Sequence, residues 1–203
     1  MIPKFTEPLL IGITGGIASG KSTVVKYLLK KGYPVIDADK LGHEVLDPTN
    51  PGYSEVVDLF GKKILRFNGT IDRKILGDIV FKDYDLLKKL NNISHPQIYK
   101  MIEKKYNYLL TESKSRVVFL EAALLIQANW HKLCDQVWLV KTKKSIALDR
   151  LQKRDNLSKK DALDRINSQD PWSKKLSCID LILVNEGFQE ELEGQIKIAL
   201  QDH

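Results

Sequence analysis

Cysteine is scarce in this sequence. Its 203 residues include two cysteines, Cys134 and Cys178, and neither belongs to a Cys-x-x-Cys pair. Because disulfide frameworks and structural zinc sites need several closely spaced cysteines, we expect neither of them here. The first residues also lack the long apolar core and the small-residue cleavage site of a signal peptide. Together these absences predict a cytoplasmic protein in a reducing compartment.

Long hydrophobic runs are missing as well. The longest apolar stretches are a few residues, whereas a helix needs about 20 apolar residues to cross a bilayer. We therefore expect no membrane partner. Hydrophobic residues nevertheless make up 43% of the chain, which is enough for a sizeable core and argues against global disorder. The length suits one core domain with a small insertion.

The charge balance is basic, with a formal net charge of +6 and a pI of about 9.1. Such a balance favours anionic partners, either nucleic acid or a polyphosphorylated small molecule. The lysine pairs are scattered along the chain, and no basic tract is interleaved with aromatic residues. We therefore expect no nucleic-acid partner.

A phosphate-binding loop is the strongest pattern present. The stretch 15–22 reads Gly-Gly-Ile-Ala-Ser-Gly-Lys-Ser, between an apolar run at 9–13 and a segment at 20–31 that suits a helix. A buried strand, a Gly-rich turn and a helix N-terminus are the context in which backbone N–H groups bind phosphate. We expect Lys21 to reach the β- and γ-phosphates of ATP and the Ser22 hydroxyl to ligate Mg²⁺. The nucleotide-binding residues expected from the loop are Gly16, Ala18, Ser19, Gly20, Lys21, Ser22 and Thr23.

The motifs of a guanine-nucleotide switch are absent. The sequence contains no Asn-Lys-x-Asp base reader, and it has no Asp-x-x-Gly in the position that a switch would need. These absences argue against a GTPase and favour a small-molecule kinase.

The apolar pattern predicts an α/β fold. A strand at 34–39 follows the first helix, which makes a βαβ unit, and further strands are expected at 117–120, 136–140 and 179–184. We therefore expect a P-loop kinase fold with a five-stranded parallel sheet flanked by helices. Residues 40–111 read as mostly helical, with a long helix beginning near Pro96. Gly32 should end the first helix, and Asp72 and Ser158 should cap later helices. We assign 1–43, 113–148 and 176–203 to a nucleotide-binding core, 44–112 to a helical insertion, and 149–175 to a separate charged segment.

Several acids fall at the predicted strand ends, where ligands bind in open α/β sheets. Asp37 and Asp39 are two apart on a predicted strand, so their side chains should share a face. One could accept the proton of an acceptor hydroxyl, and the other could orient substrate or metal-bound water. The alternative is helix capping at the strand–helix junction. Glu121 follows the third strand and either holds Mg²⁺ through water or is an exposed strand end.

Two arginines and a histidine complete the candidate site. Arg150 and Arg154 are four apart on a predicted helix that Thr142 should cap, so they share a face. They could stabilise the charge of a transferring phosphoryl group, or form ion pairs with neighbouring aspartates. His95 precedes Pro96, which predicts an extended residue at a helix start. A lone histidine of this kind is more often an N-terminal cap or a buried polar contact than a functional group.

With these residues assembled, the chain resembles the dephospho-CoA kinase family over about residues 10–190. Beyond the phosphate loop, which many NTPases share, the specific features are the segment Val-Ile-Asp-Ala-Asp at 35–39, Asp72-Arg73, His95-Pro96, and Asn-x-Gly at 185–187. Two departures stand out. Ala18 stands where the family often has Gly, which costs little at a negative φ. The segment 121–127 differs from the family's Asp-x-Pro-Leu-Leu-Phe-Glu, notably at Ala123 and Gln127.

The resemblance implies ATP-dependent phosphorylation of the ribose 3′-hydroxyl of dephospho-CoA, the last step of coenzyme A biosynthesis. It also implies an acceptor-binding domain at 44–112 and a mobile lid at 149–175. The implied roles are catalysis by Asp39, Lys21 and Arg150, ATP binding by the loop with Arg150 and Arg154, and acceptor binding by Asp37, Asp39, Arg73 and His95. We expect a monomer or weak homo-oligomer. Two alternatives stay open, namely another P-loop nucleoside or nucleotide kinase and a non-catalytic ATP-binding regulator.

Overall fold

The structure is a computed structural model that describes residues 7–169 and 176–201. The chain divides into two compact units. One, here called the core unit, comprises Met1–Ile36 and Tyr106–His203, and the other, the helical unit, comprises Asp37–Lys105. Each unit has its own apolar core and is described by itself.

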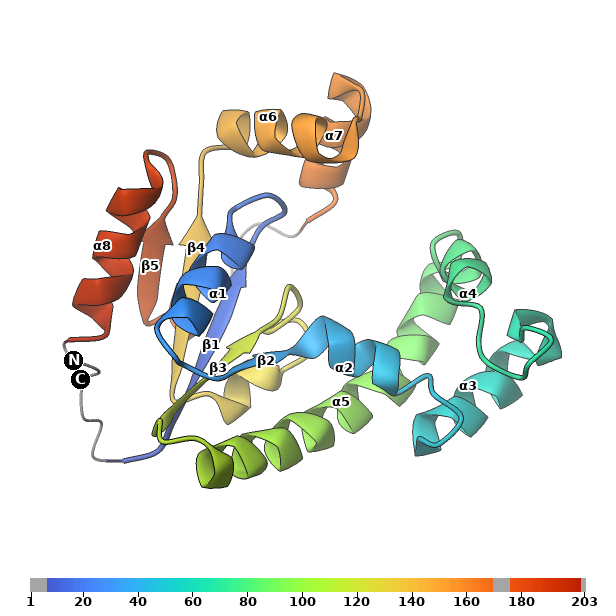
Figure 1. The fold of residues 1–203 in the computed structure, drawn as a ribbon. Coiled ribbons are helices and arrows are strands. Elements are labelled where there is room, and N and C mark those ends of the chain that lie inside the picture. The colour runs from blue at the N-terminus through green and yellow to red at the C-terminus, as the bar shows by residue number, and fades with distance from the viewer. Residues whose placement is uncertain (1–6, 170–175, 202–203) are drawn as a thin grey trace. The chain divides into compact units, whose positions relative to one another are not determined.

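A five-stranded sheet forms the centre of the core unit (Figure 1). Its strand order is β2-β3-β1-β4-β5, and the pairs β1–β3, β1–β4 and β4–β5 are parallel. The predicted five-stranded parallel sheet flanked by helices is thereby confirmed. The strands are β1 (Leu9–Gly15), β2 (Val35–Asp37), β3 (Val117–Glu121), β4 (Gln136–Lys141) and β5 (Leu181–Val184).

The central strand β1 explains why its sequence is a continuous apolar run. Every residue of β1 after Leu9 is buried, as expected for a parallel strand with neighbours on both sides and helices over the faces. Phe119 of β3 and Trp138 of β4 meet edge to face, with ring centroids 5.4 Å apart, in the same apolar cluster.

Helices α1 and α8 lie next to each other against this sheet (Figure 1). Gly32, with φ of +85°, lies just beyond the end of α1 as the sequence predicted. Ser158 caps α7 by accepting from the Asp161 N–H, also as predicted. The helices of this unit are α1 (Lys21–Lys30), η2 (Trp130–Leu133), α6 (Lys144–Asp155), α7 (Lys159–Asn167) and α8 (Gln189–Ala199).

The helical unit has a separate core, built on buried side chains such as Val56, Ile64 and Leu76. Asp72 caps α4 by accepting from the N–H groups of Lys74 and Ile75, which confirms the cap predicted there. The elements of this unit are α2 (Ala38–Glu44), α3 (Pro51–Phe60), η1 (Lys62–Ile64), α4 (Arg73–Val80) and the first part of α5 (Tyr84–Glu112).

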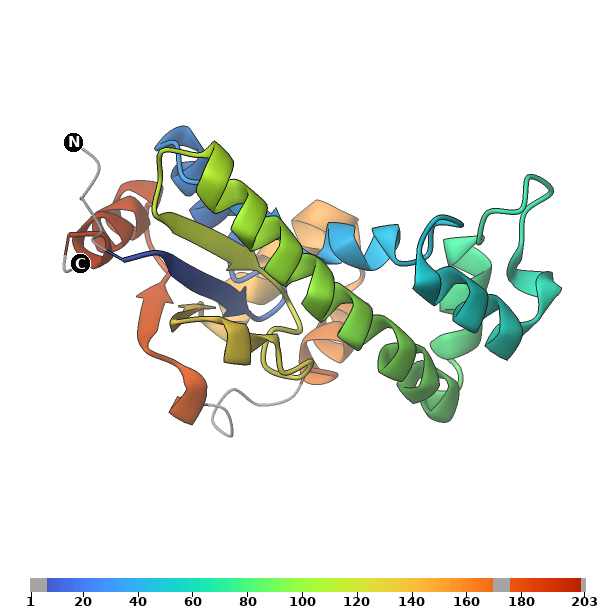
Figure 2. The same cartoon turned by 90° about the horizontal axis from the view of Figure 1, so that it is seen from below.

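Helix α5 corrects one prediction. A helix beginning near Pro96 was expected, but α5 is a single 29-residue helix that begins at Tyr84 and contains Pro96 (Figure 2). Its start is set by Asp83, whose carboxylate accepts from the N–H groups of Asp85 and Leu86. A proline inside a helix costs about 3 kcal/mol, and the burial of apolar side chains along α5 offsets that cost. Within the described residues, neither α5 nor any other helix is both long and apolar enough to cross a membrane.

Candidate active site

The phosphate loop connects the end of β1 to the start of α1. Gly15 has no room for a side chain, because an added Cβ would lie 2.4 Å from the carbonyl oxygen of Val140. Gly20 is the N-cap of α1 with φ of 101° and ψ of 23°, a left-handed conformation that favours glycine. The predicted strand, Gly-rich turn and helix are all present, and Lys21 is the first residue of the helix.

The N-terminus of α1 is well suited to an anion. Among the described residues no side chain caps it, and its first turn contains no acid. The backbone N–H groups of a first turn have no partner within the helix, and the helix dipole adds partial positive charge beside them. Among the other described helices, α2, α4, α5 and α7 have side-chain caps, whereas α3, α6 and α8 have none. The capping residues are Asp37, Asp72, Asp83 and Ser158.

A cavity of about 600 Å³ opens beside this helix start in the core unit. It brings together six of the residues that the sequence assigned to ATP, namely Ala18, Gly20, Ser22, Thr23, Arg150 and Arg154. The remaining lining comes from Lys153, Asn185, Gly187 and Gln189, to which sequence reasoning gave no role. Gly187 and Gln189 follow β5, so the rule that ligands bind beyond strand ends could have pointed to them. The cavity combines cationic side chains with an uncapped helix terminus.

The basic side chains at this site have specific partners. Lys21 Nζ donates to the carbonyl oxygen of Gly15 at 3.1 Å. Arg154 forms a two-pronged pair with Asp155, at 2.7 and 3.0 Å, which is the ion pair that the sequence left open as an alternative. Hydrogen bonding to Asp155 raises the pKa of Arg154, and the same contact lowers the pKa of Asp155. Arg150 Nη2 donates to the side-chain oxygen of Asn185 at 3.2 Å.

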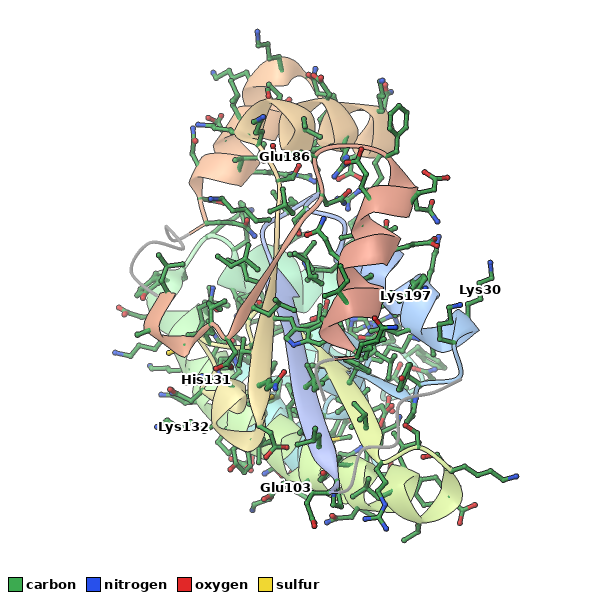
Figure 3. The ribbon with its side chains drawn as sticks, turned by 90° about the vertical axis from the view of Figure 1, so that its left-hand side faces the viewer. Lys30, Glu103, His131, Lys132, Glu186 and Lys197 are labelled. Atoms are coloured by element: carbon green, nitrogen blue, oxygen red, sulfur yellow. The ribbon has the colours of Figure 1, made fainter. Side chains whose placement is uncertain are left out.

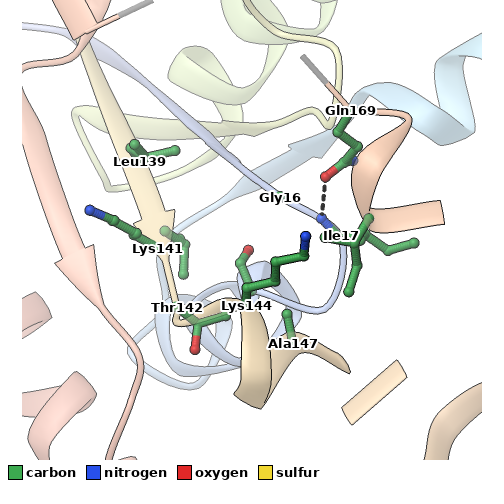
Figure 4. A pocket seen from close by; sticks show the side chains of 11 residues that line it. Gly16, Ile17, Leu139, Lys141, Thr142, Lys144, Ala147 and Gln169 are labelled. Atoms are coloured by element: carbon green, nitrogen blue, oxygen red, sulfur yellow. Dashed lines mark hydrogen bonds between the residues drawn. The ribbon is translucent and has the colours of Figure 1, made fainter. Parts of the chain in front are cut away.

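A second, smaller cavity of about 220 Å³ lies between the phosphate loop and α6 and α7 (Figure 4). Gln169 Oε1 accepts a hydrogen bond from the Ile17 N–H at 2.8 Å. Lys144 at the start of α6 donates to Asn167 at 2.7 Å. The described part of the predicted lid, 149–169, is therefore hydrogen-bonded to the loop through Gln169, while 170–175 lie outside the described residues.

The sequence predicted that Asp37 and Asp39 lie on one strand, and this prediction is wrong. The strand ends at Asp37, and Asp39 is in the first turn of α2. The reason is local, since the Asp37 carboxylate accepts from the Lys40 N–H at 3.0 Å and starts the helix. Asp37 therefore caps α2, and its contact with an acceptor stays a prediction. The Asp39 side chain is exposed.

The other two acceptor candidates lie on separate helices of the helical unit. Arg73 is the first residue of α4 and is exposed. His95 lies inside α5 and not at an extended helix start, because α5 continues through Pro96. Burial lowers the pKa of His95, so its neutral form is favoured.

Two further residues lie at strand ends of the core unit. Glu121 is the last residue of β3 and is half-buried. Thr142 does not cap α6, which begins at Lys144 and has Lys143 at its N-cap without a capping side-chain hydrogen bond in the described structure. The Thr142 hydroxyl donates instead to the carbonyl oxygen of Asn185 at 2.8 Å.

The start of α1 offers an oxygen ligand for Mg²⁺. The described residues contain no cluster of three or more His, Cys, Asp or Glu side chains that could hold a metal ion. Mg²⁺ usually keeps several waters and takes one or two protein oxygens together with substrate phosphates. The exposed Ser22 hydroxyl, in the first turn of α1 and on the wall of the larger cavity, is an oxygen ligand of this kind. The residues present fit a magnesium ion that arrives with a nucleotide.

Comparison with known proteins identifies the family. The model of the dephospho-CoA kinase family matches residues 9–191. The chain belongs to the dephospho-CoA kinase family. A curated dephospho-CoA kinase of Carboxydothermus hydrogenoformans is 42% identical over 192 residues, covering 95% of this chain and 93% of that relative.

Solved structures agree with this membership of the dephospho-CoA kinase family. The dephospho-CoA kinase from Campylobacter jejuni is 31% identical, with a TM-score of 0.70 and coverage of 95% of this chain and 96% of that one. The crystal structure of TT1252 from Thermus thermophilus is 32% identical, with a TM-score of 0.79 and coverage of 97% and 98%.

One residue of the phosphate loop has a backbone conformation that is uncommon for residues other than glycine. Ala18 has φ of +55°, in the left-handed region. Alanine would cost little here only at a negative φ, and that condition is not met. A left-handed residue with a Cβ costs about 1–2 kcal/mol, so the loop holds local strain next to the nucleotide cavity.

Proposed function

We propose that this protein transfers the γ-phosphoryl group of ATP to the ribose 3′-hydroxyl of dephospho-CoA, giving coenzyme A and ADP. The observation that carries the proposal is the family match over residues 9–191. The uncapped N-terminus of α1, where Lys21 and Ser22 lie, supports it. Coenzyme A biosynthesis would then end with this step. The proposal separates into a donor site, an acceptor site and a lid.

The donor site is the larger cavity of the core unit. Backbone N–H groups of the loop hold the ATP phosphates, and Lys21 exchanges its contact with Gly15 O for the β- and γ-phosphates. Mg²⁺, held by Ser22 and the phosphate oxygens, supplies charge neutralisation when bound. Gly16, Ala18, Ser19, Gly20 and Thr23 complete the predicted nucleotide set. Glu121, which ends the strand next to β1, would bind the ion through water.

The acceptor site is the helical block 44–112 together with the acids that precede it. Asp39 accepts the proton of the 3′-hydroxyl as that oxygen attacks phosphorus. Arg73 is exposed and suits the anionic pyrophosphate of the acceptor. His95, neutral because of its burial, and Asp37 hold the same substrate through hydrogen bonds.

The lid is the segment 149–175. Its closure would exclude water, which would otherwise accept the phosphoryl group. Arg150 and Arg154 then neutralise the charge on the transferring group. Arg154 must leave Asp155 to do so, and Arg165, 3.2 Å from the same carboxylate, remains to pair with it.

The deciding experiment is an assay that couples ADP release to dephospho-CoA. We expect turnover with dephospho-CoA and none with CMP, uridine or pantothenate. Turnover with CMP or uridine instead would indicate a nucleoside or nucleotide kinase. ATP binding without turnover of any acceptor would indicate a regulator and would overturn the proposal.

The role of Asp39 has its own test. Asp39→Asn should lower turnover by about 10²- to 10⁴-fold, the usual contribution of a general base, while ATP affinity stays unchanged. Asp58→Asn, at an exposed position of α3, is the matched control and should keep full turnover. Near-normal turnover by Asp39→Asn would show that another group accepts the proton.

We also place the protein in the cytoplasm, as a monomer or weak homo-oligomer. Both cysteines are free thiols, in accord with a reducing compartment. Sedimentation at micromolar concentration tests the oligomeric state, and a stable trimer or tetramer would contradict it.

A further inference from the structure

Asn185 is the residue that follows β5, and its backbone is anchored to the neighbouring strand. It is 7% exposed. Its N–H donates to the carbonyl oxygen of Lys141 at 2.8 Å, and its own carbonyl accepts from the Thr142 hydroxyl. The next residue, Glu186, forms an ion pair with Lys143 at 2.9 Å and lies in the loop beyond β5 (Figure 3). The position of Asn185 is thus fixed by the ends of two strands.

The side-chain amide of Asn185 joins two parts of the nucleotide site. Its Nδ2 donates to the carbonyl oxygen of Ser19 in the phosphate loop at 2.8 Å. Its Oδ1 accepts from Arg150 Nη2 at 3.2 Å. A carbonyl oxygen can only accept and a guanidinium can only donate, so these partners fix the orientation of the amide.

The bond to Ser19 constrains the loop at its most critical glycine. A peptide unit is planar and trans, so holding the Ser19 carbonyl also fixes the direction in which the Gly20 N–H points. Asn185 lies directly against Gly20, since a Cβ added there would lie 1.9 Å from Asn185 Nδ2. The left-handed Gly20 and the Asn185 amide therefore fit each other.

The bond to Arg150 orients the rest of the guanidinium. Arg150 Nη1 is buried and has no hydrogen-bond partner within the described part of the chain. It lies 3.8 Å from the point where a Gly20 Cβ would be, on the wall of the larger cavity. A buried nitrogen that carries positive charge and lacks a protein acceptor is suited to an anionic ligand.

We propose that Asn185 is a positioning residue that couples the phosphate loop to Arg150. One amide holds the loop in its anion-binding geometry and aims the free nitrogen of Arg150 at the same anion, without touching the reacting atoms. This role deepens the proposed function, because it makes the lid arginine and the loop act on ATP as one unit.

The test is a double-mutant cycle in ATP affinity, measured by calorimetry with MgATP and no acceptor. We expect Asn185→Leu and Arg150→Met each to weaken binding about tenfold, and the double variant to bind about as weakly as Asn185→Leu alone, as for residues that share one network. In turnover assays Asn185→Leu should raise KM for ATP and lower kcat together.

Gln195→Leu is the matched control. The Gln195 amide also bridges two backbone groups, since it accepts from the Val184 N–H and donates to the Val184 carbonyl, both at 2.8 Å. It stabilises the end of β5 without reaching the loop. Its loss should lower thermal stability and leave ATP affinity within about twofold of the unchanged protein.

Three results would overturn the coupling. The first is unchanged ATP affinity in Asn185→Leu. The second is a loss of affinity in the double variant that equals the product of the two single losses. The third is a loss in Gln195→Leu as large as that in Asn185→Leu. If Asn185→Leu does not fold, Asn185→Ser carries the same cycle, because its shorter side chain cannot reach both partners. Failure of the unchanged protein to phosphorylate dephospho-CoA would overturn the proposed function and leave the binding cycle interpretable.

Discussion

The Asp37 carboxylate accepts a hydrogen bond from the backbone N–H of Lys40 and thereby starts the helix whose first turn carries Asp39. Loss of such an N-cap costs about 1 kcal/mol, whereas Asp, Asn and Ser cap about equally well. Asp37→Ala should therefore lower the free energy of unfolding by about 1 kcal/mol, and Asp37→Asn should not. Urea unfolding followed by circular dichroism measures both. Equal stability of the two variants would show that the cap contributes nothing.

Replacing alanine by glycine usually lowers the free energy of unfolding, but the left-handed Ala18 predicts the opposite. Ala18→Gly should raise the free energy of unfolding by up to about 1 kcal/mol, because glycine adopts φ of +55° without a Cβ clash. Ala162→Gly, inside α7, should instead lower it by about 1 kcal/mol. Thermal unfolding of the pair tests this. A decrease for both would mean that the loop is not strained at Ala18.

Cys134 should be chemically inert in the folded protein. Burial, assisted by the negative charges of Asp135 and Asp180, raises the pKa of its thiol from 9.0 to about 12. Only the thiolate reacts with alkylating reagents. At pH 8 the native protein should thus modify at Cys134 about a thousandfold more slowly than the urea-unfolded chain, since each pKa unit is a factor of ten in thiolate. Iodoacetamide labelling of Cys178→Ser, read by mass spectrometry, isolates this thiol. Comparable rates in both states would contradict the burial.

His95 should make stability depend on pH. Its pKa in the folded protein lies below the ordinary value of 6.5 because burial disfavours the imidazolium. The unfolded chain then binds the proton more tightly, so the free energy of unfolding falls as pH drops from about 6.5 through the folded-state pKa. Below that pKa the contribution of His95 is constant.

The variant His95→Gln isolates this effect. Urea unfolding between pH 7.5 and pH 5 should show a smaller loss of stability in His95→Gln than in the unchanged protein. His43→Gln, at an exposed position in the last turn of α2, is the matched control. Identical pH profiles for His95→Gln and the unchanged protein would show that His95 does not titrate differently on folding.

Features that depend on neighbours in sequence could be predicted. The phosphate loop between a buried strand and a helix, the glycine at the end of α1 and the caps Asp72 and Ser158 follow from local chemistry, and the structure has all of them. The start of α5 is equally local, since Asp83 caps it, but a proline is a more prominent helix-start signal, so the sequence favours Pro96.

Features that depend on distant contacts could not be predicted. The Thr142 hydroxyl suits a helix cap, yet it bonds to Asn185, 43 residues away. The Asn185 amide reaches Ser19, 166 residues away. No periodicity or spacing in the sequence predicts such pairs, so only the family motif singles out Asn185. Lys153 was hidden for a similar reason, because it is one of many lysines and only the fold places it on the cavity wall.

The strand order has a consequence for folding during synthesis on the ribosome. The first strand to emerge is the central one, and both of its neighbours, β3 and β4, follow more than a hundred residues later. At about 5–20 residues per second, that strand waits for several seconds without a partner. During this interval a largely apolar segment is exposed, so the nascent chain should be a client for hydrophobic-binding chaperones. The phosphate loop, attached to the same strand, can acquire its shape only after β3 and β4 have been synthesised.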